Sequence, residues 1–166
     1  MKIKFKNISK WSNRYSYQLN ENIVLDLKRS IKNQGHLTKK QLQVICKWKS
    51  PRSAGNMLSN DPEFVEEITT FAFKTKNERS RVESLTLLDG VGWPSASVIL
   101  HLYHNDPYPL LDFRALWSIG IEKVPHYNFD FWNKYVLFCR KIALDNNVSM
   151  RVLDKALWQY SKENQI

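Results

Sequence analysis

The chain has 166 residues, which is enough for one domain or for one compact unit of two lobes. Its 25 Lys and Arg residues outnumber 16 Asp and Glu residues and give a formal charge of +9. A field of that sign attracts polyanions or an acidic membrane surface, although a basic balance can also serve solubility alone. No apolar run is long enough to span a membrane, and the N-terminus lacks the apolar block of a signal peptide.

The two cysteines lie far apart in helix-like segments, so we expect Cys46 and Cys139 to be buried free thiols in a reducing compartment. Two cysteines are too few for a four-cysteine zinc site or an iron–sulfur cluster. We therefore expect a cytoplasmic protein without a cofactor, associated with the nucleoid if it is bacterial.

In the first third of the chain, residues 2–8 alternate lysine with apolar side chains and predict a short extended segment. Residues 20–33 predict a helix that Gly35 stops, and Thr38 with Gln41 forms a capping box for the next helix. The apolar faces of these two helices are predicted to bury Ile23, Val24, Leu27, Ile31, Leu42, Ile45 and Trp48.

The middle of the chain continues with the same helical period. A short helix is expected over 53–59, and Asn60-Asp61-Pro62 begins a longer one, because proline is favoured near the first helical position. Helices over 79–88 and 94–103 flank a glycine turn. The residues expected to face inward are Phe64, Ile68, Phe71, Val82, Leu85, Leu88, Ala96, Ile99, Leu100 and Tyr103.

In the last third, Asp112 occupies an N-cap position before a short helix that Gly120 closes. A long helix follows over 128–145, and Ser149 caps the last helix. The apolar period is near 3.6 almost throughout, so we predict an all-α fold of about eight or nine helices. The expected architecture is a compact, two-lobed single domain over 1–166, built around a helix-hairpin-helix at 85–104.

The turn Gly90-Val91-Gly92 carries the first functional signal. Two glycines so close together let the backbone approach a ligand and point its N–H groups outward. Pro94 begins the next helix, whose N-terminus adds a positive dipole end. Such a turn suits a phosphate, although an ordinary helix–turn–helix with a glycine cap has the same composition.

This hairpin resembles that of the helix-hairpin-helix DNA glycosylase superfamily, the endonuclease III-like proteins. The family's pattern is Leu-Pro-Gly-Val-Gly, followed by a small Ala and an aliphatic run. The chain departs from the pattern at Asp89, where the family usually has proline, and it matches at Leu88, Gly90, Val91, Gly92 and Ala96. The resemblance implies a double-stranded DNA partner and backbone amides that hold a DNA phosphate.

The same family places a catalytic aspartate at the start of the next helix, and Asp112, 18 residues after Pro94, resembles it in position. An Asp at a helix N-terminus stays ionised because the dipole and amides favour its charge. Its carboxylate could then stabilise an oxocarbenium-like sugar or orient a water that attacks C1′. The alternative is a plain N-cap without a catalytic role.

Members of the family that also cut the DNA strand carry a lysine at the place of Pro94, and proline cannot form their Schiff base. The resemblance therefore implies a monofunctional glycosylase, a hydrolase without lyase activity. Lys123 and Lys134 lie outside the frame of the motif and are not promoted to that role.

Aromatic and basic residues complete the candidate site, because enzymes that flip a base stack it in a pocket. We assign the base pocket to four aromatics of the central stretch: Trp93, Tyr103, Tyr108 and Trp117. The predicted DNA contacts are Gly90, Val91, Gly92, Trp93, Ser95, Lys49, Arg52 and Arg114. Most of the chain's aromatics must nevertheless belong to the core, and Lys49 and Arg52 also fit a solvated loop.

A metal site at His101 and His104 is not favoured, because a third ligand in a recognisable motif is missing. Three functional interpretations remain: a monofunctional glycosylase acting on a damaged or modified base, a non-catalytic hairpin DNA-binding protein, and a helical interaction protein. A monomer is expected.

Overall fold

The fold is entirely helical in the part of the chain that the structure describes. The computed structural model covers residues 2–16, 20–52, 54–124 and 126–165. These ranges hold ten α-helices, two 3₁₀ helices and no strand, which confirms the all-α class. Among them, no helix is both long and apolar enough to cross a bilayer.

The chain divides into two compact units. Unit 1 joins Met1–Gln18 to Pro107–Ile166, and unit 2 is the intervening segment Leu19–Asp106. The glycine turn therefore belongs to unit 2, whereas Asp112 belongs to unit 1, a few residues after the chain crosses from one unit to the other.

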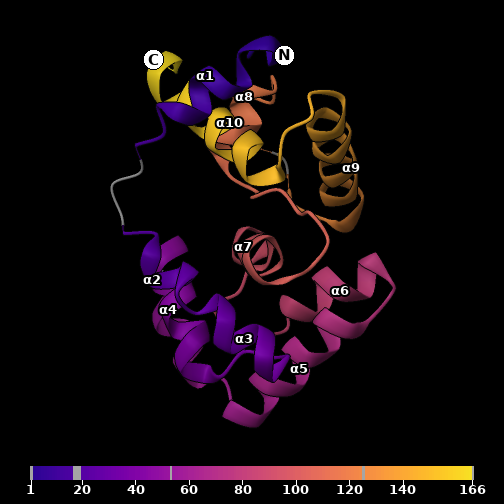
Figure 1. Cartoon of the computed structure of the whole chain (residues 1–166). Coiled ribbons are helices and arrows are strands. Elements are labelled where there is room, and N and C mark those ends of the chain that lie inside the picture. Colours follow the sequence, from indigo (N-terminus) through magenta and orange to yellow (C-terminus); the bar gives the residue numbers. More distant parts are fainter. Residues whose placement is uncertain (1, 17–19, 53, 125, 166) are drawn as a thin grey trace. The chain divides into compact units, whose positions relative to one another are not determined.

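Unit 2 is built around α7, Trp93–Tyr103, against which α3, α4 and α6 pack (Figure 1). Most side chains of α7 are buried, including the predicted Ala96, Ile99 and Leu100. The other elements of the unit are α2 (Asn22–Leu25), α3 (Lys28–Gln34), α4 (Lys39–Lys49), η2 (Ala54–Ser59), α5 (Pro62–Lys74) and α6 (Glu78–Leu85).

Several predicted boundaries of unit 2 are confirmed. Gly35 ends α3 with φ +76°, in the left-handed region that glycine tolerates. Thr38 and Gln41 form the predicted capping box of α4, which ends at Lys49. Residue 53, where a short helix was expected to begin, lies outside the described residues, and η2 runs from the next position.

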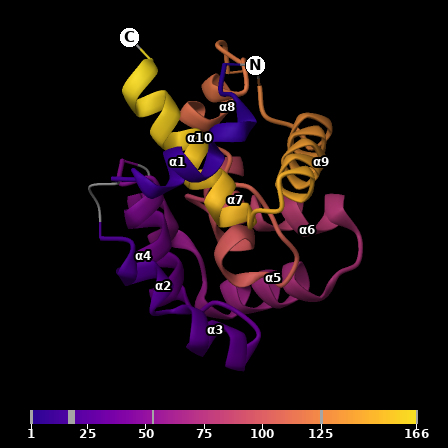
Figure 2. The ribbon, with the colours of Figure 1, turned by 45° about the horizontal axis from the view of Figure 1, so that its top comes forward.

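Unit 1 is organised around α10, Met150–Asn164, which contacts α1, α8 and α9 (Figures 1 and 2). The two ends of the chain meet here, because Tyr160 Oη donates to the Lys2 carbonyl at 2.9 Å and the Ile3 amide donates to Ser118 O at 3.1 Å. The remaining elements are η1 (Phe5–Asn7), α1 (Ile8–Asn13), α8 (Phe113–Ser118) and α9 (Phe129–Asp145).

The expected extended segment at residues 2–8 is wrong. The chain forms the 3₁₀ turn η1 there and enters α1 at Ile8. Ile3 and Ile8 are buried, so the apolar residues of this segment do face the core. Their alternation with lysine predicted a strand, whereas the segment forms a turn and the start of a helix. The side chain of Phe5 lies outside the description.

The helix expected over 20–33 is interrupted and forms α2 and α3. The break coincides with a hydrogen bond from Tyr103 Oη to Val24 O at 2.9 Å, the carbonyl that the Lys28 amide would reach in an unbroken helix. Val24 and Ile31 are buried as predicted, whereas Ile23 is 51% exposed.

The inward face assigned to α5 is also wrong. Phe64 is 38% and Phe71 is 47% exposed, whereas the buried face consists of Val65, Thr69 and Ala72. These smaller side chains allow the close contacts of α5 with α4 and α6. Thr69 Oγ1 also accepts the Leu37 amide at 2.9 Å, which a bulky apolar side chain could not do.

Candidate functional site

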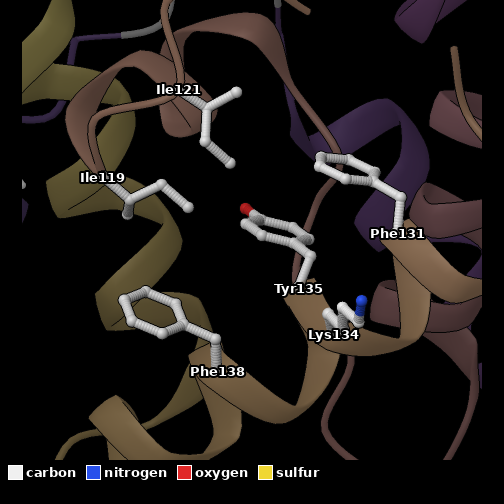
Figure 3. Close-up of a pocket in the computed structure, with 6 residues that line it drawn as sticks. All are labelled: Ile119, Ile121, Phe131, Lys134, Tyr135 and Phe138. Carbon is white, nitrogen blue, oxygen red and sulfur yellow. The ribbon is translucent and has the colours of Figure 1, made fainter. Parts of the chain in front are cut away.

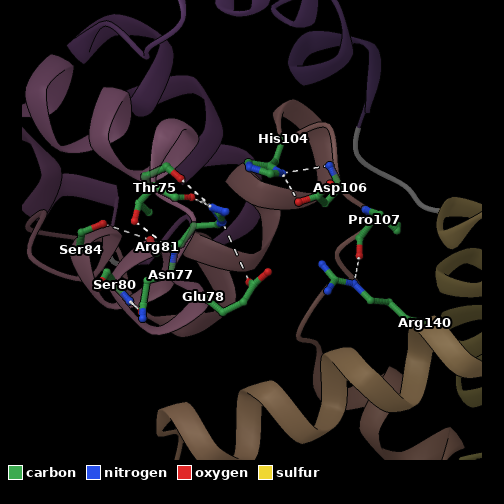
Figure 4. Close-up of polar contacts among 11 residues, drawn as sticks. Thr75, Asn77, Glu78, Ser80, Arg81, Ser84, His104, Asp106, Pro107 and Arg140 are labelled. Atoms are coloured by element: carbon green, nitrogen blue, oxygen red, sulfur yellow. Dashed lines mark hydrogen bonds and ion pairs between the residues drawn. The ribbon is translucent and has the colours of Figure 1, made fainter.

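The loop before Asp112 is fixed at its start by α9. Arg140 Nε donates to Pro107 O at 2.8 Å (Figure 4), and its guanidinium lies 4.7 Å from the ring centroid of Tyr108. Tyr108 is 1% exposed and stacks on Trp132 with centroids 5.8 Å apart. The first two residues of the loop, Pro107 and Tyr108, are therefore held against α9.

Its end is fixed by two further hydrogen bonds to Leu110. Tyr135 Oη donates to Leu110 O at 3.0 Å, and the Leu110 amide donates to Asp154 Oδ1 at 3.1 Å. Asp154 is only 3% exposed, so this hydrogen bond satisfies a buried acceptor. Both polar groups of Leu110 are thus tied to helices, two residues before Asp112.

Asp112 is the N-cap of α8, as predicted. Its Oδ1 accepts the Arg114 amide at 2.9 Å, and the residue is half-buried. Burial and the Asp112 charge raise the pKa of Tyr127. Burial is also the main cause that raises the pKa of Tyr135, to which the Asp112 charge adds. The cap hydrogen bond thus orients the Asp112 carboxylate, and its charge acts on two phenols of the same unit.

An apolar pocket of about 390 Å³ lies in the same unit (Figure 3). Its walls are the residues after α8 and one face of α9: Ile119, Ile121, Phe131, Lys134, Tyr135 and Phe138. Tyr135 connects the pocket to the loop, because the same side chain lines the pocket and bonds Leu110. The volume suits a small ligand such as one heterocyclic ring system, and Lys134 supplies a cationic group.

The hairpin in unit 2 has the geometry that its glycines predict. Gly90 has φ +78°, and Gly92 is the N-cap of α7. Val91 between them is 4% exposed and anchors the turn in the core. The amides of Gly90 and Gly92 donate no hydrogen bond to another described residue, so they remain available to an acceptor from outside.

A buried amide side chain holds the residue that departs from the family pattern. Asn60 is 4% exposed; its Oδ1 accepts the Asp89 amide at 2.8 Å, and its Nδ2 donates to Asp89 O at 2.9 Å. The Asp89 carboxylate accepts Ser59 Oγ–H at 2.8 Å. This clamp, made by the last residue of η2 and the residue after it, fixes the approach to the turn at Asp89.

The first helix of the hairpin is fixed just as firmly. Asn77 caps α6 by accepting the Ser80 amide at 2.9 Å (Figure 4). Arg81 is 4% exposed and donates to the carbonyls of Ala72 and Thr75 at the end of α5. Its Nε also lies 4.0 Å from Glu78 Oε2, three residues earlier on α6, but the two carbonyls that it bonds at the end of α5 could not be assigned from the sequence.

Among the other predicted DNA contacts, the structure separates exposed from buried side chains. Arg52 is exposed in the turn after α4, and Lys49 is half-buried at the last position of that helix. Trp93, the first residue of α7, is half-buried. Ser95 is only 2% exposed, with its Oγ 3.5 Å from Ser50 Oγ, so its side chain is committed to the interior. The Arg114 guanidinium lies over the ring of Trp158 at 5.6 Å.

The four aromatics assigned to the base pocket do not share one environment. Tyr103 is 8% exposed, with its hydroxyl bonded inside unit 2, and Tyr108 is stacked inside unit 1. Trp117 is half-buried, with Lys2 Nζ 3.9 Å from its ring centroid. Only Trp93 and Trp117 of the four therefore keep substantial exposed surface.

Sequence reasoning missed the aromatics that do line a pocket near Asp112. Phe131, Tyr135 and Phe138 follow the spacing i, i+4 and i+7, which places them on one face of α9. That spacing was available in the sequence, but the parallel stripe through Trp132 and Val136 is the one that the core uses.

The histidines form no metal cluster. In the part of the chain that the structure describes, no three His, Cys, Asp or Glu side chains lie close enough together to hold a metal ion. His104 Nδ1 accepts the Asp106 amide at 3.0 Å, which gives this side chain a local role at the end of α7 (Figure 4).

Both cysteines are free and buried, as predicted. Burial raises the pKa of the Cys46 thiol to about 11, and its Sγ lies 3.9 Å from Gly90 O as a weak donor. Burial, followed by the Asp154 charge, raises the pKa of Cys139. Neither thiol is suited to act as a nucleophile near neutral pH.

Comparison of the chain with protein-family models, with curated proteins and with solved structures yields no match.

Proposed function

We propose that the chain is a helix-hairpin-helix DNA-binding protein that acts as a monofunctional DNA glycosylase on a damaged or modified base. The single observation that carries the proposal is the environment of Asp112: a half-buried carboxylate at the end of a pinned loop, in the unit that also holds an apolar, aromatic pocket. The resemblance of the hairpin and of the interval to Asp112 supports the same activity.

Each part has a physical task in this proposal. The amides of Gly90 and Gly92, beside the N-terminus of α7, bind a phosphate of the DNA strand. The extruded base enters an apolar pocket, where aromatic side chains replace the stacking lost from the duplex. The Asp112 carboxylate stabilises the positive charge that develops on the sugar, or orients the attacking water, as the N-glycosidic bond breaks.

A second candidate function is a non-catalytic hairpin DNA-binding protein. The observation that favours it is the hydrogen bond from the Arg114 amide to Asp112 Oδ1, since N-capping of α8 accounts for an aspartate at this position without any chemistry. Both functions require the hairpin to bind DNA, and they differ in whether a base is released.

The test is an abasic-site assay over a panel of duplexes, each containing one damaged or modified base. We expect one or more substrates to yield strand breaks after alkali treatment and none without it, because Pro94 stands where strand-cutting members of the superfamily that the hairpin resembles carry lysine. Binding without abasic sites on any substrate would support the non-catalytic function, and breaks without alkali would contradict the monofunctional mechanism.

A further inference from the structure

One face of unit 1 gathers cations around two aromatic rings. Tyr15 and Trp158 pack edge to face with centroids 5.4 Å apart. The cations around them come mainly from α10, and we call this set the Tyr15–Trp158 face: Tyr15, Arg114, Arg151, Lys155, Trp158 and Lys162. Four of the six, at 151, 155, 158 and 162, follow the helical spacing i, i+4, i+7 and i+11 and so form one stripe along α10.

The rings hold the cations in place. Arg151 and Lys155 lie 5.3 Å from the Tyr15 centroid, and Lys162 lies 5.2 Å from that of Trp158. Lys162 Nζ also donates to the carbonyl and hydroxyl of Ser16 at 2.9 Å. Cation–π contacts of this kind restrict long side chains that would otherwise be mobile, so the charges are preorganised for a ligand.

Two cations of this face, Arg114 and Lys155, lack a carboxylate partner among the described residues. Of the nearby acids, Glu163 pairs with Arg14. Burial and the neighbouring Arg151 charge lower the pKa of Lys155, as expected where like charges share a surface.

We propose that the Tyr15–Trp158 face binds the sugar-phosphate backbone of DNA, as a second contact surface besides the hairpin. This partner rests on the proposed function, which supplies DNA as the ligand. The cations from Arg151 to Lys162 extend over about 16 Å of helix, which matches the rise of about five nucleotides of one strand. Arg114 belongs to this face and directly follows the first residue of α8, so the contact continues to the Asp112 cap.

An acidic membrane surface is the competing partner for a basic, aromatic helix, but α1 and α10 lack what membrane insertion needs. Among their described residues, neither helix has a large apolar side chain that is exposed. A helix that lies in a bilayer interface presents such side chains to the lipid. Phosphate binding by preorganised cations fits this face better.

The test measures affinity for an undamaged 20-base-pair duplex by fluorescence anisotropy between 50 and 200 mM NaCl. The double variant Arg151→Gln/Lys155→Gln is expected to bind DNA about tenfold or more weakly than the wild type. The plot of log affinity against log salt has a negative slope, and the variant's slope should be less steep by about two, one for each lost phosphate contact. The control Lys32→Gln/Lys141→Gln removes the same charge from two exposed side chains outside the face and should keep the wild-type slope.

A charge-preserving variant, Arg151→Lys/Lys155→Arg, separates charge from packing and should retain the wild-type affinity. If the Gln variant binds DNA with the salt dependence of the wild type, the Tyr15–Trp158 face does not bind DNA, and the proposed function is unaffected. If the wild type releases no base from any substrate but the binding assays give the predicted salt slopes, the glycosylase activity is refuted and DNA binding by the face is supported. Binding to phosphatidylserine vesicles in preference to DNA, abolished by the Gln variant, would overturn the nucleic-acid assignment.

Discussion

The turn at residues 89–92 and the loop at 107–112 both present functional groups from rigid positions, but they obtain their rigidity differently. The turn depends on backbone shape: Gly90 adopts φ +78°, and a Cβ there would lie 2.9 Å from the Met57 amide nitrogen. The loop depends on side chains of α9 and α10 that bond its carbonyls and amides. The turn keeps the amides of Gly90 and Gly92 unbonded to other described residues although Asn60 bonds the backbone of Asp89, whereas the loop holds its carboxylate in place through bonds to the backbone of Pro107 and Leu110.

The largest expected effect is at the turn. Gly90→Ala should lower the free energy of unfolding by about 3 kcal/mol, since left-handed strain adds to a clash with backbone that cannot move aside. Urea denaturation measures the change.

Two other glycines separate the cost of left-handed backbone strain from the cost of the steric clash. Gly35 has φ +76° but open space around its Cβ position, so Gly35→Ala should cost only about 1 kcal/mol. Gly55 has neither constraint, and Gly55→Ala should stay within about 0.5 kcal/mol of the wild type. Equal costs at Gly90 and Gly35 would show that the close approach of η2 contributes nothing.

The loop offers the next largest effect. Asp154→Ala should cost about 2 kcal/mol, because the Leu110 amide loses its buried acceptor, and it should slow any base release by displacing Asp112. Asp154→Asn keeps an oxygen acceptor and should restore most of the stability. Identical denaturation curves for the Ala and Asn variants would contradict the positioning role of this hydrogen bond.

A pH-dependent effect is expected from the Cys46 thiol, which lies beside the turn. Burial raises the pKa of Cys46 in the folded state to about 11, from an ordinary thiol pKa of 9.0, so the folded state binds more protons between these pH values. The free energy of unfolding must therefore fall as pH rises from 9 to 11, by at most about 1.4 kcal/mol per pH unit from this group. Cys46→Ala should decline less steeply, and an unchanged slope would show that the thiol does not contribute.

The sequence predicts many local features of the chain well, including Gly90 in the turn and Asp112 at the end of the loop. Capping residues such as Thr38, Asp112 and Ser149 act through neighbours in the chain, so their patterns can be read directly. The left-handed glycines Gly35 and Gly90 are local signals of the same kind.

Long-range contacts explain what the sequence could not predict. The clamp of Asn60 on Asp89 joins residues 29 positions apart, and the bond from Leu110 to Asp154 joins residues 44 positions apart. The buried face of α5 consists of its smaller residues because α4 and α6 pack closely against it. Hydrophobicity alone does not predict which face packs so closely. Tyr103 and Tyr108 entered the predicted base pocket for their ring type, whereas their burial depends on partners elsewhere in the chain.

The central claim is that Asp112 does chemistry besides capping α8. Its most direct test is the single-turnover rate of alkali-labile site formation, measured for wild type and Asp112→Asn on a substrate that the wild type processes. Asparagine is also a good N-cap, so α8 and the DNA affinity should be retained while base release falls at least a hundredfold, roughly the contribution of one charged catalytic group. A variant that releases the base at the wild-type rate would contradict the account and leave Asp112 as a cap alone.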